Sequence, residues 1–529
     1  MTAFDVLSGV IPVFVAAGLV VLVLQALSAG KDRARAAKTA IGCGLMVLVA
    51  LVVILGASGG GGGGGGQPDD PDVPAADYAL ANGFLTLNGD VPSYSGNAPW
   101  RDSGAGLIVV TDEVGSIGKG AFSDMSSDVL FEGVPRIAGG AFSHPFASDP
   151  VEGGYYMVQG GYYVLVPEVP EDMYVYTVTS GKATLTGISD TWERPEHFVM
   201  KVPAENYNRY PVVSTISRTS MSISPFLGAR AVFSESIETV GSYAFVQCSS
   251  LAAASFPVAD VVKSNAFQYC SGLAAASFPA ATSLEGYSFS YCSALSAVSF
   301  PDVTSLGTYV FQNCTALKDV SLPEATTFGT YVFTSCTSLK EVAFPAVTTV
   351  GSNVFMYCTA LKSASLPRAT SVSTTMFSNC VSLEYVEMPS ATTIGSTAFQ
   401  YCAKMTSFDL SAVTSVSSNA FRYAWGVQEV VFSPDLASVS TSNNPFSSWT
   451  FYDSTGTTTL AKTAEALAGK TFQGTYAALI EVPEGEQSLS PEMLRKVADL
   501  TEAAEEARKS LASPEDDEHL PGGDPEEEW

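Results

Sequence analysis

The chain has 529 residues and a formal net charge of −27, with nine cysteines and three histidines. This length exceeds what one hydrophobic core usually organises, so several domains or a repeat array are expected. The acidic balance argues against nucleic acid as a partner, because phosphates attract Lys and Arg; solubility is the simpler consequence of the charge. No Cys-x-x-Cys pair occurs and no histidine lies near a cysteine, so we expect no metal site and no cofactor.

Residues 1–57 contain two apolar runs, Val6–Leu27 and Ile41–Leu55. At about 1.5 Å per residue the first is long enough to span a bilayer, and the second just reaches that length. The loop between them carries a basic cluster (Lys31, Arg33, Arg35 and Lys38), which the positive-inside rule places in the cytoplasm. We therefore predict two transmembrane helices with a short cytoplasmic loop, in the cell membrane, and the rest of the chain extracellular.

A cleaved signal peptide followed by a stop-transfer helix is the alternative topology, and it would leave the rest of the chain inside the cell. No basic residue precedes the first apolar run, whereas a secretory signal normally starts with positive charge. The paired-helix topology is therefore favoured.

Residues 58–106 begin with the glycine run Gly59–Gly66, followed by prolines and acidic residues. Such a run has no side chains to bury, so it is typical of a flexible tether. We interpret the whole segment as a Gly/Pro-rich tether and lead-in to the next domain. A phosphate-binding loop is excluded, because no Gly-Lys-Ser/Thr follows the glycines.

The central chain is organised by a 22-residue period. Phenylalanine, cysteine and leucine recur three residues apart, and the cysteines of the period are Cys248, Cys270, Cys292, Cys314, Cys336, Cys358, Cys380 and Cys402. A fixed period of this size predicts a solenoid, in which each unit is too small to bury its own apolar face and stacks on its neighbours. Free cysteine behaves as a compact apolar residue, so a ladder of buried thiols is the favoured interpretation. Disulfides between adjacent turns are the alternative.

The period assigns the remaining boundaries. Residues 107–146 contain weaker copies, with Ile117 and Phe122 at repeat positions, and are predicted to be degenerate leading repeats. Residues 147–225 lose the period and are rich in Tyr, Val, Gly and Pro, which predicts an inserted β-rich module. The solenoid proper is assigned to residues 226–434, a C-terminal cap to 435–485, and a helix with an acidic tail to 486–529. Ser490 is the expected N-cap of a helix over Pro491–Leu511.

The repeat motif, Ile/Val-Gly-x-x-Ala-Phe-x-x-Cys-x-x-Leu-x-x-Val-x-Leu/Phe-Pro, is present at Ile394–Met405 and Phe333–Pro345. It resembles the BspA-like class of leucine-rich-repeat surface proteins. The resemblance implies an extracellular, curved, non-catalytic scaffold used for adhesion or protein recognition. It names no ligand and offers no catalytic residues to carry over.

Two sets of variable residues are candidates for contact with a protein or glycan on another cell or on the envelope. The outward strand positions are small at first (Ala253, Ser255, Ala275 and Ser277) and charged later. Tyrosines recur at one phase in three successive repeats and at a second phase in others, and tyrosine offers amphipathic contact area. Solvation of the charges and shielding of the core by the tyrosines are the plainer interpretations. The predicted partner-binding residues are Tyr287, Tyr309, Tyr331, Lys318, Lys340, Glu341, Tyr385 and Glu387.

The fold class predicted is thus a β-rich solenoid of the leucine-rich-repeat type, with N-terminal transmembrane helices and an inserted module. Its expected function is that of a membrane-anchored recognition or adhesion scaffold. A structural envelope protein is the second hypothesis. An enzyme is the third, because Glu193, Glu196, His197 and Tyr207 place titratable groups in the predicted insert, but they include no nucleophile or metal-ligand spacing.

Overall fold

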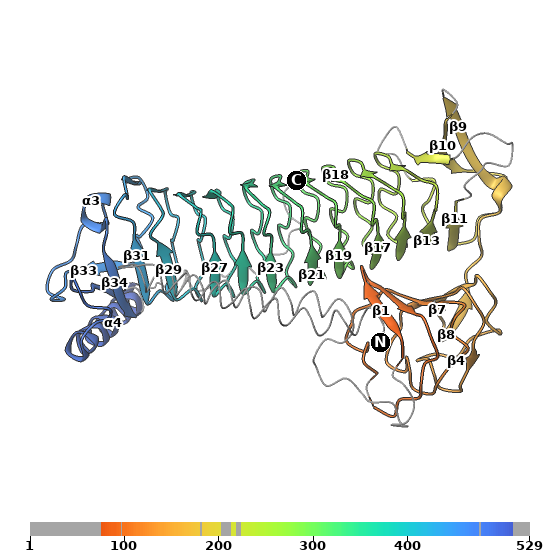
Figure 1. The fold of residues 1–529 in the computed structure, drawn as a ribbon, viewed down its shortest axis with the longest axis horizontal. Helices are drawn as coiled ribbons and strands as arrows, with labels where there is room; N and C mark the ends of the chain where they lie inside the picture. Colours follow the sequence, from red (N-terminus) through yellow and green to blue (C-terminus); the bar gives the residue numbers. More distant parts are fainter. Residues whose placement is uncertain are drawn as a thin grey trace, which may run out of the picture.

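A computed structural model describes residues 76–96, 98–179, 182–202, 213–217, 224–475 and 478–511. Both predicted transmembrane runs, the glycine run and the acidic tail lie outside these residues. Within the described ranges, no helix is long and apolar enough to cross a membrane. The described chain forms a long solenoid with a smaller body beneath its first turns and a cap at its far end (Figure 1).

Each turn of the solenoid contributes one three- to five-residue strand and one two-residue strand. In a representative turn the chain runs along β21 (Asp319–Ser321), turns after Pro323, runs along β22 (Thr327–Phe328), and returns to β23 (Glu341–Ala343). Pro323 has no N–H to give to a ladder and so ends β21. Equivalent strands pair in parallel at an offset of 22 residues, for example Ala297 with Asp319. The sequence period is therefore the length of one turn.

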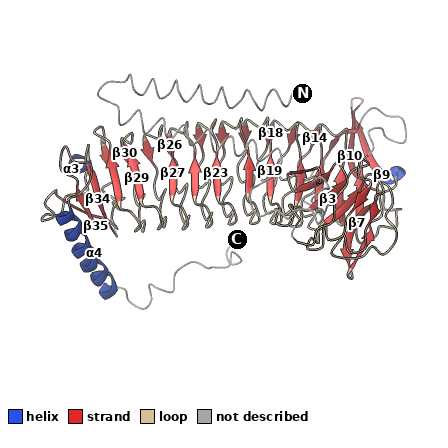
Figure 2. Cartoon of the chain, turned by 60° about the horizontal axis from the view of Figure 1, so that its bottom comes forward, coloured by secondary structure: helices blue, strands red, loops and turns tan. Residues whose placement is uncertain are grey.

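We call the outward surface of the longer strands the strand face. From the first turn to the last its strands are β11 (Phe198–Lys201), β13 (Ala229–Phe233), β15 (Ala253–Ser255), β17 (Ala275–Ser277), β19 (Ala297–Ser299), β21, β23, β25 (Ser363–Ser365), β27 (Tyr385–Glu387), β29 (Ser407–Leu410) and β31 (Glu429–Phe432). The shorter strands form a second side of the coil: β14 (Thr239–Val240), β16 (Val261–Val262), β18 (Ser283–Leu284), β20 (Ser305–Leu306), β22, β24 (Thr349–Val350), β26 (Ser371–Val372), β28 (Thr393–Ile394), β30 (Ser415–Val416) and β32 (Ser438–Val439). Figure 2 shows both series along the length of the molecule.

The repeat residues fill one continuous core. Phe245, Phe267 and the phenylalanines of the same column as far as Phe421 stack with ring centroids 5.1 to 5.7 Å apart. Each thiol from Cys270 to Cys402 is fully buried and donates to the carbonyl of a phenylalanine 25 residues earlier, at 3.0 to 3.2 Å. No disulfide joins these seven cysteines. The buried thiol ladder is confirmed, and each thiol also links two turns.

The predicted leading repeats belong to a separate N-terminal body. Its six-stranded sheet has the order β1-β2-β3-β5-β7-β8, with parallel pairing of β2, β3 and β5 and an antiparallel hairpin at each end. The strands are β1 (Tyr78–Ala81), β2 (Phe84–Leu87), β3 (Leu107–Val110), β5 (Asp128–Phe131), β7 (Tyr155–Gln159) and β8 (Tyr162–Leu165), with the short pair β4 (Ser116–Ile117) and β6 (Arg136–Ile137). Its core contains Trp100, Phe122 and Phe131. The predicted leading repeats do stack in parallel, β3 on β5 and β4 on β6, but the antiparallel hairpins end this short stack, so it is separate from the main solenoid.

This body also corrects the segment assignments on either side of 107–146. The supposed lead-in contains β1, β2 and the buried Trp100, whose Nε1 donates to the Ala121 carbonyl at 2.9 Å. The supposed insert 147–225 is not one module. Its β7 and β8 complete the N-terminal sheet, whereas β11 starts the strand face, and β9 (Tyr174–Thr179), β10 (Lys182–Ile188) and β12 (Val213–Ile216) extend the short-strand side. The short 3-10 helix η1 (Glu171–Met173) precedes β9.

The last turns are closed by a cap. β34 (Thr471–Thr475) runs antiparallel to β31 and pairs with β35 (Ala478–Glu481), which pairs in turn with β33 (Thr450–Tyr452). The four-residue helix α3 (Ala464–Leu467) is N-capped by Thr463. Helix α4 (Pro491–Leu511) lies where the sequence predicts it, and Ser490 Oγ accepts from Met493 N at 3.3 Å. β32 still pairs with β30, so the short-strand side continues past residue 434.

Candidate interaction surfaces

The N-terminal body covers the strand face over its first turns. The side chains of Leu107, Val109 and Tyr155 on the body's sheet pack against Ala231, Ala253 and Ala275, and all of these are buried. Ala231, Ala253 and Ala275 are aligned neighbours on β13, β15 and β17. Their small side chains let the two sheets approach face to face. The small outward residues of these repeats therefore mark a covered surface.

Backbone contacts also join the N-terminal body to the solenoid. The turn between β1 and β2 places the Asn82 carbonyl 3.1 Å from the donating N–H of Ala276. A Cβ on Gly83 would lie 2.2 Å from the Ala274 carbonyl oxygen, and one on Gly106 would lie 2.3 Å from the Ala274 Cβ. Only glycine fits at these two positions. The hydrogen-bonded strand order of the face is interrupted between β17 and β19, as it also is between β21 and β23 and between β27 and β29.

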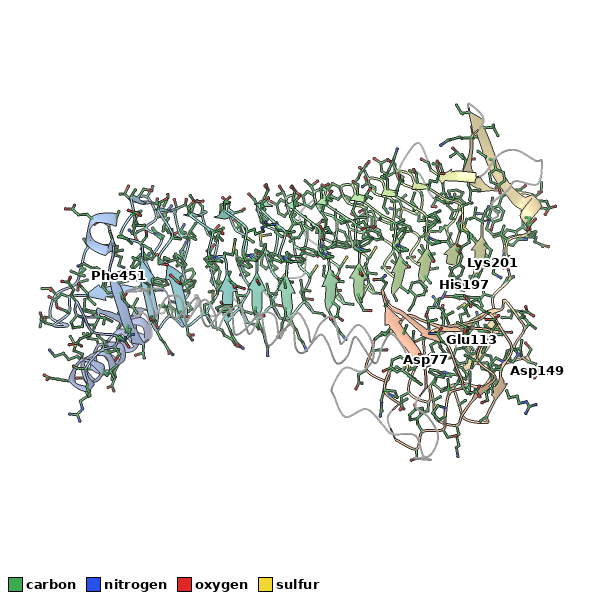
Figure 3. The ribbon with its side chains drawn as sticks, in the orientation of Figure 1. Asp77, Glu113, Asp149, His197, Lys201 and Phe451 are labelled. Carbon is green, nitrogen blue, oxygen red and sulfur yellow. The ribbon has the colours of Figure 1, made fainter. Side chains whose placement is uncertain are left out.

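A buried ion pair joins the same interface. Arg230 on β13 donates from Nε and Nη2 to the two oxygens of Asp128 on β5, at 2.6 and 2.9 Å, and the Tyr155 hydroxyl donates to Asp128 Oδ2 at 2.6 Å. Burial and the Asp128 carboxylate raise the pKa of Tyr155, which keeps its hydroxyl a donor. Lys201 adds an ion pair to Glu168 and donates to the Gly153 carbonyl. It lies at the junction of the two bodies in Figure 3.

Beyond β19 the strand face is open. Lys318, Lys340 and Lys362 stand at one position in three successive turns and are exposed, as are Asp319 and Glu341 beside them. Further along, Tyr385 is 57% exposed, and Glu384, Asp409 and Glu429 are exposed as well. Among the described residues none of these charged side chains forms an ion pair. Five of the predicted partner-binding residues (Lys318, Lys340, Glu341, Tyr385 and Glu387) thus lie on this open section.

The negative charges shape the environment of Tyr385. Partial burial raises the pKa of its hydroxyl, and the carboxylates of Glu387 and Asp409 raise it further. Glu387 is held in place by the Ser365 hydroxyl, which donates to Oε2 at 2.7 Å. Tyr385 is therefore a neutral, exposed aromatic side chain in a negative field.

The other three predicted residues, Tyr287, Tyr309 and Tyr331, lie on a different side of the turn, directly after the short strands. Their rings stack at 4.5 and 4.6 Å between centroids and are half-buried. All three have φ of 61°, and Asn265 and Asn353 occupy the same left-handed position in the flanking turns. The sequence treats the strand-face residues and these tyrosines as two separate sets, and the coil places the two sets on different sides.

The second tyrosine phase is also left-handed, with φ from 61° to 64° at Tyr269, Tyr291, Tyr357, Tyr401 and Tyr423. Tyr269 and Tyr291 stack at 4.8 Å while remaining about two-fifths exposed. Arg422 lies 4.6 Å above the Tyr423 ring. These columns surround the phenylalanine core and present ring edges to solvent.

The groups considered for chemistry in the supposed insert are not gathered into one site by what the structure describes. His197 lies at the start of β11, and its Nε2 is 4.0 Å from Glu196, whose side chain is 82% exposed. Tyr207 lies outside the described residues. No group of three or more His, Cys, Asp or Glu within the described ranges is arranged to hold a metal ion.

Comparison with known proteins identifies the repeat. The family model described as "BspA type Leucine rich repeat region" matches residues 229–340 and 326–450, with six copies. No curated protein matches the sequence. Similar solved structures include a leucine-rich cell surface protein of Faecalibacterium prausnitzii A2-165, at 18% identity over 55% of this chain and 90% of that one, with a TM-score of 0.34.

Two further structures have comparable similarity. A leucine-rich repeat protein of T. pallidum is 20% identical over 45% of this chain and 90% of its own, with a TM-score of 0.27. One from Bacteroides ovatus ATCC 8483 is 18% identical over 50% of this chain and 88% of its own, with a TM-score of 0.26.

Proposed function

Because residues 229–450 are a BspA-type leucine-rich repeat region, we propose that the protein is a membrane-anchored, non-catalytic cell-surface scaffold that recognises a protein partner. The recognition surface is the open section of the strand face, from β21 to β31. The anchor is the pair of apolar runs before residue 57, with the repeats outside the cell.

The observation that carries this proposal is the contrast between the two sections of the strand face. Over β13–β17 the outward residues are alanines buried under the N-terminal body. From β21 onward they include lysines, carboxylates and a tyrosine that are exposed and form no ion pair in the described chain. Exposed charges at ladder spacing are unfavourable where like charges face each other, as Lys318, Lys340 and Lys362 do. A complementary partner removes this cost and gains specificity from the charge pattern.

Site-specific photocrosslinking on intact cells tests the recognition surface. The full chain carries a benzophenone amino acid in place of Tyr385, and a matched variant carries it in place of Tyr331 on the other side of the turn. We expect a discrete protein adduct from position 385 that is lost with Lys340→Glu/Glu341→Lys. Equal adducts at both positions, or none at 385 while the repeats remain folded, would contradict the proposal.

Protease treatment of intact cells tests the topology separately. With the repeats outside, trypsin added to whole cells cleaves the chain after exposed Lys and Arg residues, and lysis releases no further protected fragment. Complete protection of the repeats until lysis would place them inside the cell. That result would overturn the surface location while leaving the recognition surface itself testable in lysates.

A further inference from the structure

A groove interrupts the short-strand side at β18. Directly after the short strands, one position in successive turns holds Ser264, Gly286, Thr308, Thr330, Ser352, Thr374, Ser396 and Ser418. Gly286 alone in this column has no side chain. The open groove here has a volume of about 630 Å³, and Gly286, Ser264 and Thr308 are among the residues that line it. Small-molecule sites typically span roughly 300–1,000 Å³.

Hydroxyl groups and one carboxylate line the groove. Glu285 reaches back one turn, where its Oε2 accepts from the backbone N–H of Ser264 at 3.1 Å and from its hydroxyl at 2.9 Å. Glu285 Oε1 has no protein partner among the described residues. The hydroxyls of Ser283, Ser305 and Thr308 also line the groove, and none of them hydrogen bonds to another described side chain. The groove therefore offers several donors and acceptors to a ligand.

An aromatic ring borders the same groove. One face of Tyr287 is covered by Tyr309, with centroids 4.5 Å apart and planes within 10°. The preceding turn has Asn265 at this position, so the tyrosine stack ends at Tyr287. Asn265 and Tyr287 both line the groove, so the half-buried tyrosine ring borders its hydroxyl-lined surface. The Asn265 amide is oriented by its donation to Gln268 Oε1 at 2.7 Å.

We propose that this groove binds a neutral saccharide. A sugar ring carries an apolar C–H face that packs against the Tyr287 ring, and hydroxyls that pair with Ser283, Ser305, Thr308 and Glu285 Oε1. Glu285 disfavours acidic sugars, because a second carboxylate next to it is repelled. This site goes beyond the recognition function proposed above. It lies on another side of the coil from the strand face, so a saccharide and a protein partner bind independently.

Saturation-transfer NMR tests the site with the full chain, kept in a detergent that has no sugar headgroup. The probes are neutral trisaccharides of glucose, galactose, mannose and N-acetylglucosamine, with sialyllactose as the acidic comparator. We expect saturation of at least one neutral trisaccharide and at least tenfold weaker binding of sialyllactose. Gly286→Thr introduces into the groove the side chain that the next two turns carry at this position. Its Cβ would lie 3.3 Å from the nearest Thr308 atoms. It should weaken neutral binding at least tenfold, as should Tyr287→Ala.

Two matched controls keep the result interpretable. Ser352→Thr places a threonine in the same column outside the groove, and Tyr331→Ala truncates the other end of the tyrosine stack. Both should bind the neutral trisaccharide as the native chain does. Binding by none of the four neutral probes, or binding unchanged by Gly286→Thr, would overturn the saccharide site. Neither outcome bears on crosslinking at Tyr385, so the two proposals fail separately.

Discussion

At the scale of single residues, the stacked phenylalanine column lies at the centre of the core. Phe311 is fully buried, and its ring stacks on Phe289 and Phe333 at 5.7 and 5.6 Å. Phe311→Ala should lower the free energy of unfolding by about 3 to 5 kcal/mol, the usual range for truncating a buried aromatic. Urea denaturation of the full chain measures it, with Tyr357→Ala at an exposed position as the control. A loss below about 1 kcal/mol for Phe311→Ala would be inconsistent with a tightly packed column.

Because of the thiol ladder, the free energy of unfolding should fall as the pH rises into the alkaline range. Burial raises the pKa of Cys314 and Cys358 to about 12, against about 8.5 in an unfolded chain. Above that lower value the unfolded thiols lose protons and the folded ones keep theirs, so stability falls as pH rises towards about 12. Each ionised thiol contributes about 1.4 kcal/mol per pH unit.

Urea denaturation at about pH 7.5 and about pH 10 measures this effect. The double variant Cys314→Ala/Cys358→Ala should be less stable than the native chain at both pH values, because each substitution leaves a cavity. Its free energy of unfolding should nevertheless fall less between the two pH values, because two of the titrating thiols are gone. An identical loss in the native chain and the variant would mean that the thiols do not titrate on unfolding.

At the scale of elements, the docking of the N-terminal sheet on β13–β17 depends on glycine. Gly106→Ala introduces a Cβ 2.3 Å from that of Ala274, which forces the two sheets apart. We expect amide exchange of β15 and β17 to accelerate by about tenfold or more, the factor that about 1.4 kcal/mol supplies. Gly139→Ala is the matched control, because nothing lies within 4 Å of its Cβ. Unchanged exchange in Gly106→Ala would show that the interface does not protect these strands.

The same elements show where sequence reasoning succeeds and where it stops. The 22-residue period predicted the turn, the buried columns and the thiol ladder because each depends on neighbours one turn away. The period also showed that the leading repeats end near residue 147, but the irregular strands beyond it, such as β7 and β8, carry no pattern that tells which body they join. The split of the supposed insert between two bodies was missed for that reason.

The candidate surfaces were predicted less well for a related reason. The burial of Ala253 and Ala275 could not be predicted from the repeat alone. It depends on contact with Leu107 and Val109, which lie more than 140 residues away in the sequence. Tyr309 and Lys318 lie nine residues apart, yet they face different sides of the coil. The groove at Gly286 could have been predicted by aligning the repeats, because glycine interrupts a series of Ser and Thr at this repeat position.

At the scale of the whole molecule, both ends of the solenoid are covered. Residues of β34 pair antiparallel with β31 at one end. At the other end, β9 and β10 form an antiparallel pair that begins the short-strand sheet, and the N-terminal body covers the first part of the strand face. Repeat proteins need such atypical ends to remain soluble. The free surfaces are therefore the sides of the coil, where the charged strand face and the Gly286 groove lie.

The offset of 22 residues between paired strands from β13 to β31 has an evolutionary consequence. Recombination between repeats of equal length adds or deletes a whole turn and leaves the surviving strands in register, as in Glu341↔Ser363 and Ser407↔Glu429. Each such event changes the length of the open section by about 4.8 Å, the spacing between neighbouring strands. Turns beneath the N-terminal body lack this freedom, because Asn82, Gly83 and Gly106 fit one particular turn. The gene can thus lengthen or shorten its exposed half while its docked half stays fixed.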